Sequence, residues 1–597
     1  MTHQSENVSR LEIIDVQLTD VNAVSMLTLA DAGVFLVVVP SNHQWTTAAS
    51  KDGWQQQLRG LANRLDSESV LAILTTSSDA AETILQQSEI LKYQLWVAVK
   101  HRAVQPSDGR RLPEQHAALL IFTKYRRSLK HTKTRIGYSF CPVCDKTTKD
   151  YGGKKHTYHE YGTLMSDVWR DITWSPSESP TSIVERLADV FGVSPHRSLT
   201  VISVADSSTD EQSKPKQKRN KSSESDSRVD SLKSELIQND CLEALRMLPS
   251  DSVDFCFADP PYNLAKHYDS CDDALDIRAY FKWCDDWLDE LARVLRPGRT
   301  CAVLNIPQWT ARHFSHLRTR LTFQNWIAWE GLSLPVRMIM PANYSIACFS
   351  KGEPRLLPGF SGVADGEELD LTSLKEWHCL RAGCVEHRRK ARIADREPIS
   401  DLWWDIHRLK HNSKRVDHPC QLPPALMRRL IALFTKPDEI VLDPFDGAGT
   451  TSLCAAAMAR RFIGIELSKQ YHEIAKSRHE LLADGGDPFA KTDRVPQSKN
   501  SRVKRIGQAD YKIPKKTLQL EVRQIAQQLG RLPTRDEVAA VSQYPIGMFD
   551  DYFISWGEVC AAARTTGMQE TRPTTRSVSR RANSSQQQRV LFETAEK

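Results

Sequence analysis

Two short clusters carry the side chains best suited to chemistry, and the first is Asp259-Pro260-Pro261-Tyr262. It follows an apolar run at 253–258 that is typical of a buried strand, and the carboxyl ends of strands in open α/β sheets are where ligands bind. The Asp259 carboxylate and a backbone carbonyl held by two prolines could accept hydrogen bonds from an exocyclic amino group, which turns the nitrogen lone pair toward an electrophile. Tyr262 offers an aromatic face on which an extruded base could stack. A proline-rich turn without a catalytic role is the alternative.

The second cluster is a glycine-containing segment, Asp-Pro-Phe-Asp-Gly-Ala-Gly-Thr at 443–450. It lies between a strand pattern at 439–443 and a helix pattern from about 451, and its glycines allow close approach of the backbone to a ligand. Glu466 ends the next strand pattern, 19 residues beyond Gly447, a distance that suits a hydrogen bond to a ribose hydroxyl. Alone, this segment could bind a nucleotide or NAD, but Ser452 replaces the third glycine of the dinucleotide fingerprint, which disfavours NAD. The segment also lacks the Gly-Lys pair of a phosphate-binding loop.

Alternating strand and helix patterns must position these clusters. Apolar residues recur at helical spacing over 280–295, and further short apolar runs typical of strands occupy 301–304 and 461–465. This alternation predicts an α/β fold with a largely parallel sheet between helices, which is a Rossmann-like arrangement.

Taken in order along 235–480, these segments resemble the amino-methylating DNA methyltransferases, in the group whose catalytic tetrad precedes the cofactor loop. The resemblance implies direct methyl transfer from S-adenosylmethionine, without a covalent enzyme intermediate. Catalysis would then involve Asp259, Pro260, Pro261 and Tyr262. The positions that match the family's cofactor site are Asp240, His418, Gln421, Asp443, Phe445, Gly447, Gly449, Thr450 and Glu466. Asp446 departs from the family pattern, but an additional acid should not exclude a sulfonium cation.

The resemblance also bears on the target base. An Asp at the first tetrad position is more typical of enzymes that methylate N6 of adenine, so we expect an adenine methyltransferase acting on double-stranded DNA in a restriction-modification or orphan setting. Methylation of N4 of cytosine is the first alternative. A catalytically inactive DNA-binding protein is the second, and RNA or protein methylation by a similar tetrad is a further one. A cognate restriction endonuclease is an expected partner.

The sequence contains an internal repeat that relates the first part of the chain to the part with the two clusters. Residues 91–98 parallel 321–328, and 166–172 parallel 400–406, with similar offsets. Since the first copy lacks the tetrad and the glycine segment, we expect it to be a degenerate methyltransferase-like domain that forms an internal pseudo-dimer within a monomer. The predicted divisions are this domain at 1–205, a disordered linker at 206–230, the catalytic domain at 231–483, a second linker at 484–508, a small helical DNA-binding module at 509–570 and a disordered tail at 571–597. The module resembles the helical repeat attached to homing endonucleases; a helical packing domain is the alternative.

Cysteine and histidine spacing suggests a metal site. Cys141 and Cys144, followed by His156 and His159, have nearly the spacing of a zinc finger, although an ordinary loop is the alternative. In the second copy the corresponding region contains His378, Cys379, Cys384 and His387, a separate and weaker zinc candidate. The basic run at 387–392 could contact DNA phosphates or form a solvated helix face.

Composition sets the broad class. The chain has 597 residues, 40% hydrophobic and 26% charged, with a formal net charge of +6 that permits nucleic-acid binding. The sequence contains neither a signal-peptide pattern nor a long apolar run, so we expect a cytoplasmic, nucleoid-associated protein with reduced cysteines and no membrane contact.

Overall fold

The computed structural model divides into two compact units, Met1–Arg494 and Val495–Lys597. The described residues lie within 11–205, 232–489 and 515–563, with gaps at 18–32, 40–47, 105–108, 126–128, 130, 133, 139, 148–161, 173, 176–177, 194–196, 264–275, 332–338, 359–370, 376–378, 380, 407–420, 554–555 and 561–562. The predicted first linker and tail therefore lie outside the described residues, as does most of the second linker. Among the helices described, none is both long enough and apolar enough to cross a membrane.

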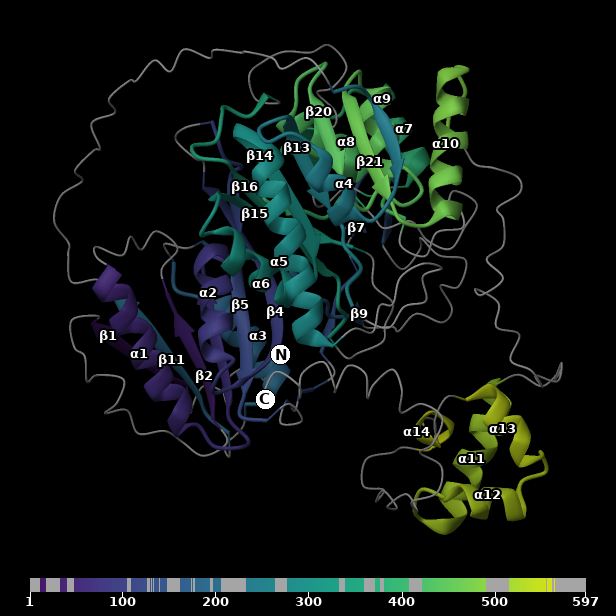
Figure 1. Ribbon diagram of the computed structural model, residues 1–597. Helices are drawn as coiled ribbons and strands as arrows, with labels where there is room; N and C mark the ends of the chain where they lie inside the picture. Colours follow the sequence, from purple (N-terminus) through teal and green to yellow (C-terminus); the bar gives the residue numbers. More distant parts are fainter. Residues whose placement is uncertain are drawn as a thin grey trace. The chain divides into compact units, whose positions relative to one another are not determined.

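The second half of the larger unit, residues 232–489, is built on a mixed sheet of eight described strands (Figure 1). In spatial order they are β12 (Glu235–Gln238), β21 (Arg461–Glu466), β20 (Ile440–Asp443), β13 (Val253–Ala258), β14 (Leu295–Asn305), β16 (Asn343–Ser350), β15 (Thr322–Glu330) and β19 (Leu402–Trp403). The helices are α4 (Cys241–Met247), α5 (Ile277–Val294), α6 (Pro307–Leu317), α7 (Ala382–Lys390), α8 (Pro424–Phe434), α9 (Thr450–Ala457) and α10 (Lys469–Ala483). The predicted α/β class is confirmed.

Helices on the sheet explain its uninterrupted apolar strands. Every residue of β13 is buried, as expected for a strand covered on both faces. On one face, α8 packs Phe434 against Phe255 of β13 with ring centroids 5.4 Å apart. Helix α5 begins at Asp276, whose side chain accepts the backbone N–H groups of Arg278 and Ala279, and its apolar side is buried as the helical spacing predicted.

The connections of β13 and β20 create a gap between their carboxyl ends. From β13 the chain passes through α5 to β14 on one side, whereas from β20 it passes through α9 to β21 on the other. The two strands pair in parallel, Phe255 with Val441 and Cys256 with Leu442, so they form a topological switch point. Ligands bind at this place in open α/β sheets.

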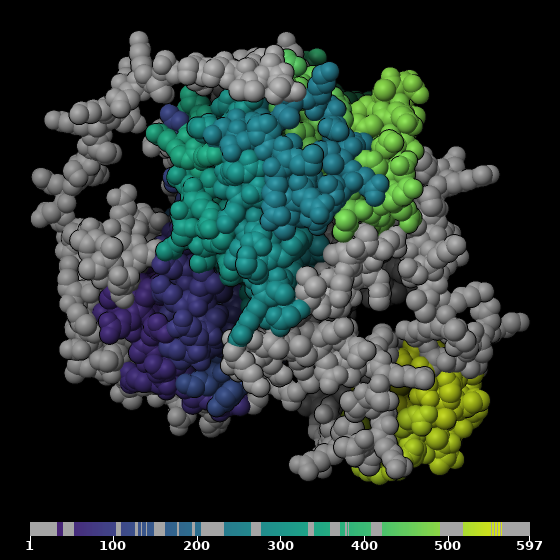
Figure 2. Space-filling view, viewed as in Figure 1, coloured from purple at the N-terminus to yellow at the C-terminus, as the bar shows by residue number. Residues whose placement is uncertain are grey.

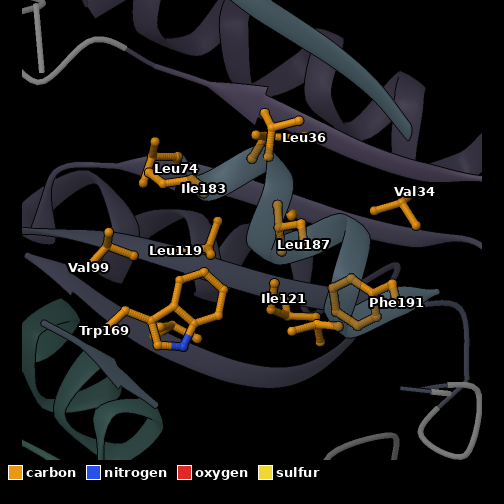
Figure 3. Close-up of a cluster of buried hydrophobic side chains, with 14 of the residues drawn as sticks. Val34, Leu36, Leu74, Val99, Leu119, Ile121, Trp169, Ile183, Leu187 and Phe191 are labelled. Carbon is orange, nitrogen blue, oxygen red and sulfur yellow. The ribbon is translucent and has the colours of Figure 1, made fainter. Parts of the chain in front are cut away.

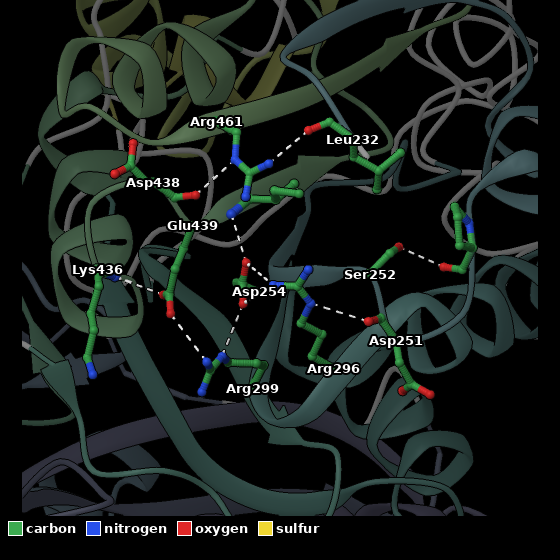
Figure 4. Close-up of polar contacts among 12 residues, drawn as sticks. Leu232, Asp251, Ser252, Asp254, Arg296, Arg299, Lys436, Asp438, Glu439 and Arg461 are labelled. Carbon is green, nitrogen blue, oxygen red and sulfur yellow. Dashed lines mark hydrogen bonds and ion pairs between the residues drawn. The ribbon is translucent and has the colours of Figure 1, made fainter. Parts of the chain in front are cut away.

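A charge network holds the opposite, amino ends of the same strands (Figure 4). The buried Asp254 carboxylate accepts Arg296 Nη1 at 3.1 and 3.0 Å, Arg299 Nε at 3.2 Å and the backbone N–H of Ile440 at 3.0 Å. Because Ile440 begins β20, this carboxylate ties β20 to β13 and β14. The switch point is thereby built on strands that are fixed at their far ends.

The first half, residues 11–205, repeats this arrangement. Its sheet contains, in spatial order, β1 (Leu11–Gln17), β11 (Leu199–Ala205), β2 (Val34–Val38), β3 (Val70–Thr75), β5 (Glu114–Thr123), β4 (Lys92–Val104) and β10 (Val168–Trp169). Its helices are α1 (Ala48–Arg64), α2 (Ser77–Gln87) and α3 (Thr181–Phe191). The order from β11 to β10, with its parallel and antiparallel pairings, matches the order from β20 to β19. Even the register irregularity recurs, between Tyr93 and Leu95 in β4 and between Phe323 and Asn325 in β15.

The first half has its own core, but its described residues contain no counterpart of the glycine segment. Helix α3 places Ile183, Leu187 and Phe191 on the sheet, where they face side chains of its central strands (Figure 3). Beside β11 lies β1, in the position that β21 occupies beside β20. Strand β11 ends at Ala205, the last residue described before 232, so no counterpart of α9, β21 or Glu466 is found in the described part of this half.

The two halves meet through equivalent residues, and Figure 2 shows them in broad contact. Trp96 of β4 stacks on Trp326 of β15, with ring centroids 4.6 Å apart and planes at 12°. Asp167 Oδ1 accepts the backbone N–H of Ala342 at 2.7 Å, and Asp401 Oδ1 accepts that of Gln115 at 2.7 Å. Since each interaction has its mirror in the other half, the contact is self-complementary, as between the subunits of a twofold dimer.

Three short hairpins or strand pairs complete the larger unit. They are β6 (Arg135–Ile136) with β9 (Thr163–Leu164), β7 (Phe140–Cys141) with β8 (Lys146–Thr147), and β17 (Thr372–Leu374) with β18 (Arg396–Pro398).

The smaller unit is helical among its described residues. It contains α11 (Lys515–Leu529), α12 (Arg535–Val541), α13 (Ile546–Tyr552) and α14 (Trp556–Val559). A capping box begins α12, where Thr534 and Glu537 satisfy each other's backbone N–H groups. Leu518 and Val522 of α11 are fully buried, whereas Leu529 at its end is exposed.

Candidate active site

A cavity at the switch point brings both predicted clusters together. The tetrad follows β13 and the glycine segment follows β20, and both line the same space. The predicted site residues that line it are Asp240, Asp259, Pro260, Pro261, Tyr262, Gln421, Asp443, Phe445, Gly447, Thr450 and Glu466. Gly449 does not line it, and His418 lies outside the described residues.

The tetrad is held by hydrogen bonds from neighbouring aromatic side chains. The Tyr262 hydroxyl donates to Asp259 Oδ1 at 2.8 Å, which orients the carboxylate. The Tyr280 hydroxyl of α5 donates to the Pro261 carbonyl at 2.9 Å, and Trp309 Nε1 of α6 donates to the Tyr262 carbonyl at 3.3 Å. The turn is therefore fixed at two of its carbonyls by the helices that follow β13 and β14.

The glycine segment is shaped by Asp443. One oxygen of this buried carboxylate accepts the Phe445 backbone N–H at 2.8 Å, and the other accepts the Thr451 hydroxyl at 2.6 Å. Gly447 and Gly449 both have left-handed backbones, with φ of 54° and 79°. A Cβ on Gly449 would lie 2.9 Å from the Ala475 Cβ, so this glycine permits close packing of α9 on α10.

Asp446 lines the cavity and also connects the glycine segment to α9 and β21. Its carboxylate accepts the Ser452 hydroxyl at 2.6 Å and the Ser452 backbone N–H at 3.2 Å. A Cβ on Gly464 of β21 would lie 2.3 Å from Asp446 Oδ2, so the acid packs directly on the strand backbone. Burial raises the pKa of Asp446 to about 6, although the hydrogen bonds from Ser452 oppose the shift.

Glu466 and Asp240 lie at the ends of neighbouring strands. Glu466 accepts the backbone N–H of Gly447 at 2.9 Å and that of Ser468 at 2.7 Å, so it joins β21 to the glycine segment. Burial raises the pKa of Glu466 to about 7, and these two backbone hydrogen bonds oppose that rise. Asp240 caps α4 by accepting the N–H groups of Leu242 and Glu243.

Several aromatic lining residues were not predicted from the sequence. Trp329 of β15 donates its indole N–H to the Ile406 carbonyl at 2.7 Å and lies 5.6 Å from the ring of Tyr344 on β16. Trp283 lies on the apolar stripe of α5 and contacts Phe445 at 5.7 Å. The cavity is also lined by further residues outside the predicted site set, which are Cys241, Leu422, Pro444, Ala448, Thr451, Leu467 and Tyr471. The sequence around Trp329 and Tyr344 did not indicate that they line a cavity, because the cavity is formed by strands that are distant from one another in sequence.

The cysteines adopt an arrangement that the sequence did not predict. Cys141 and Cys144 lie with Cys379 and Cys384, and the four sulfurs are within 4.8 Å of one another. The separation into two metal candidates, one in each half, was therefore wrong: the two cysteine pairs form one cluster. His156, His159 and His378 lie outside the described residues, and His387 is exposed.

The basic run beside this cluster is also corrected in part. The Arg388 side chain is fully buried and pairs with Asp395, so it is neither a phosphate contact nor part of a solvated face. Arg389 and Lys390 are largely exposed and pair with Glu386.

Comparison with known proteins agrees with this geometry. The DNA methylase family matches residues 253–477, which include both clusters. The Type II methyltransferase M.BamHI of Bacillus amyloliquefaciens is 34% identical over 41% of this chain, and the match spans 56% of that relative. The DNA adenine methyltransferase YhdJ of Escherichia coli (strain K12) is 27% identical over 46% of this chain and 92% of its own length. The Type II methyltransferase M.HpaI of Haemophilus parainfluenzae is 30% identical over 42% of this chain. Because that last match is 30% identical and covers 76% of M.HpaI, the chain belongs to the DNA methylase family.

Proposed function

We propose that the chain transfers a methyl group from S-adenosylmethionine to the exocyclic amino group of a base in double-stranded DNA, foremost N6 of adenine. The observation that carries this proposal is the shared cavity: an Asp-Pro-Pro-Tyr turn and a glycine turn followed by an acid line one space at adjacent strand ends. The names of three relatives, two Type II methyltransferases and one DNA adenine methyltransferase, point the same way.

The residues around the glycine segment fit the cofactor. S-adenosylmethionine supplies an electrophilic methyl group on a sulfonium centre. The Glu466 carboxylate would accept the ribose hydroxyls, since each of its oxygens retains acceptor capacity beside the backbone N–H that it already holds. Phe445 and Trp283 give the cavity an aromatic wall, and the left-handed backbone of Gly447 allows the ligand to approach the turn.

The tetrad would activate and orient the amino group. Asp259 accepts one N–H of that group, which increases electron density on the nitrogen as it attacks the methyl carbon. The Pro260 carbonyl is the candidate for the second N–H, because the Pro261 carbonyl already accepts the Tyr280 hydroxyl. Tyr262, Trp329 and Tyr344 supply aromatic surfaces for an extruded base. The base would have to leave the helix, since its amino nitrogen is paired inside the duplex.

Nucleoside analysis separates the two target bases. Purified protein is incubated with double-stranded DNA and S-adenosylmethionine, and the digested nucleosides are identified by mass spectrometry. N6-methyladenine is the expected product. N4-methylcytosine would support the alternative target at the same site, and methylation of RNA or protein but not DNA would contradict the proposal. An inactive DNA-binding protein would yield no methylated product, although the intact tetrad and glycine segment argue against that alternative.

We also propose that the first half is a degenerate copy of the catalytic half and acts as a built-in pseudo-subunit that helps hold DNA. The matching strand order and the self-complementary contact support this role.

The smaller unit would add DNA affinity through exposed basic residues of its helices. A cognate restriction endonuclease and a cytoplasmic, nucleoid-associated location belong to the same proposal. Deleting residues 509–597 should weaken DNA binding and make the DNA affinity less dependent on salt concentration, because fewer phosphates are contacted. Methyl transfer should persist at high enzyme concentration.

A further inference from the structure

Four cysteines from two distant segments converge where the halves of the larger unit meet. Cys141 and Cys144 lie in the hairpin of β7 and β8, which is inserted between β5 and β10 of the first half. Cys379 precedes α7 and Cys384 lies in its first turn, in the segment inserted between β16 and β19 of the second half. Because β5 corresponds to β16 and β10 to β19, each half contributes two cysteines from the equivalent insertion.

The four sulfurs all lie within 4.8 Å of one another, and two of their separations match the edge of a tetrahedral site for a single ion. Cys141 Sγ is 3.7 Å from Cys384 Sγ, and Cys144 Sγ is 3.6 Å from Cys379 Sγ. Four sulfurs at about 2.3 Å from a central zinc are about 3.8 Å apart along each edge of the tetrahedron. A disulfide needs sulfurs at about 2.0 Å, well inside the observed separations. Iron–sulfur clusters bind cysteines to several irons and hold their sulfurs further apart.

The surroundings fit a negatively charged metal–thiolate centre. Four thiolates around one Zn²⁺ carry a net charge of about −2, which a buried site must compensate. Arg388 Nη1 lies 3.0 Å from Cys384 Sγ, and the fully buried Arg388 side chain also pairs with Asp395. Its Nη2 finds no hydrogen-bond partner among the described residues. Lys146 and Arg381 line the hollow beside Cys144 and Cys384 and add positive charge.

We propose that Cys141, Cys144, Cys379 and Cys384 bind one zinc ion, which fastens the two halves of the larger unit to each other. The site is separate from the methyl-transfer cavity, because none of its residues lines that cavity. It contributes to folding by joining two insertions whose described residues form short strand pairs and the helix α7. Its existence does not depend on the proposed function, since a chain without methyltransferase activity would still bind the ion.

Elemental analysis of the full chain, purified under reducing conditions without added metal, tests the proposal directly. We expect about one zinc per chain. Replacing zinc with Co²⁺ should give the intense visible absorption and sulfur charge-transfer bands of tetrahedral thiolate coordination. Absence of zinc, together with failure of the reduced chain to bind added zinc, would overturn the proposal. Iron in place of zinc, or Cys141–Cys384 and Cys144–Cys379 disulfides found by mass spectrometry, would overturn it equally.

Substitutions identify the ligands. Cys144→Ser and Cys379→Ser, one in each half, should each lose most of the bound zinc and lower the midpoint of thermal unfolding. Cys560→Ser removes a buried cysteine of the smaller unit, and His387→Ala removes an exposed imidazole beside the site; both should keep zinc. If a cysteine variant does not fold, the cobalt spectrum of the unsubstituted chain still decides the coordination. Retention of full zinc content by both Cys144→Ser and Cys379→Ser would contradict the assignment. Loss of zinc from His387→Ala would contradict the four-cysteine ligand set, because it would show that a histidine is a ligand in place of one sulfur.

Discussion

The Asp259 carboxylate is oriented before a base arrives, since Tyr262 donates to one of its oxygens at 2.8 Å. Its proposed hydrogen bond to the amino group strengthens as the nitrogen gains positive charge, so its loss should act on the transition state. We therefore expect Asp259→Ala to lower the rate of methyl transfer by about 10²–10³-fold. Affinity for S-adenosylmethionine, measured by calorimetric titration, should stay close to that of the parent chain.

Tyr262→Phe is the matched control for that variant, because it removes the hydroxyl that orients Asp259 and keeps the stacking face. It should retain more activity than Asp259→Ala. Near-normal transfer by Asp259→Ala would show that the carboxylate does not contact the amino group.

Glu466 predicts a pH dependence of cofactor binding. Its pKa is raised to about 7 by burial, so the group is mostly protonated at pH 6 and mostly ionised at pH 8. An ionised carboxylate is the better acceptor for ribose hydroxyls, so affinity for S-adenosylmethionine should rise with pH across this range, by up to about tenfold. Asp446, with a pKa of about 6, titrates nearby. Glu466→Gln should bind more weakly and keep only the pH dependence that the neighbouring acids Asp443 and Asp446 contribute, since burial raises the pKa of both. An unchanged pH profile in this variant would contradict the role of Glu466.

At the scale of single residues, the sequence predicted the groups whose chemistry is specific to a short motif. The tetrad and the acid that ends β21 were recognisable because their spacing follows from the strand–turn–helix unit that carries them. Trp329 and Tyr344 were not, since an aromatic residue in a strand is most often part of a core. Arg388 was misassigned because its basic neighbours are exposed while its own side chain is buried.

At the scale of elements, the interface between the halves depends on two equivalent aspartates. Asp167 accepts the backbone N–H groups of Ala342 and Asn343 at the start of β16. Removal of the carboxylate leaves both backbone N–H groups buried without a hydrogen-bond acceptor, at a cost of about 1–3 kcal/mol each. We expect Asp167→Ala to lower the free energy of unfolding by about 2–5 kcal/mol in denaturant titration.

Asp171→Ala is the control for this variant. Asp171 pairs with Arg186 within the first half and is substantially exposed, so its loss should cost less than about 1 kcal/mol. If the two variants are equally stable, the aspartate caps do not hold the interface.

Element order was largely predictable, and element contacts were not. The alternation of apolar runs and helical stripes predicted the α/β class, and the two repeated segments coincide with β4 and β15 and with β10 and β19. The convergence of the four cysteines was hidden, because their sequence separation is 243 residues for one pair and 235 for another. Pairings at such separations depend on how the two sheets meet, which no local pattern encodes.

At the scale of the whole molecule, the self-complementary contact between the halves predicts that the protein is a monomer in solution. The surface that a catalytic domain would offer to a second copy is already covered by the first half, through Trp96 on Trp326. Light scattering of the DNA-free protein should give the mass of one chain. A fragment of 231–597 should self-associate through the uncovered face. A stable two-chain mass for the full protein, or a fully active monomeric fragment, would contradict the pseudo-dimer.

We propose that the cavity at the switch point methylates an amino group in DNA. Sequencing DNA from cells that express the chain, with detection of modified bases, tests it most directly when cells expressing Asp259→Ala serve as the reference. We expect N6-methyladenine at one short recurring sequence in cells with the unsubstituted chain and none at that sequence in the reference. Modification that persists with Asp259→Ala, or unmodified DNA in both, would contradict it.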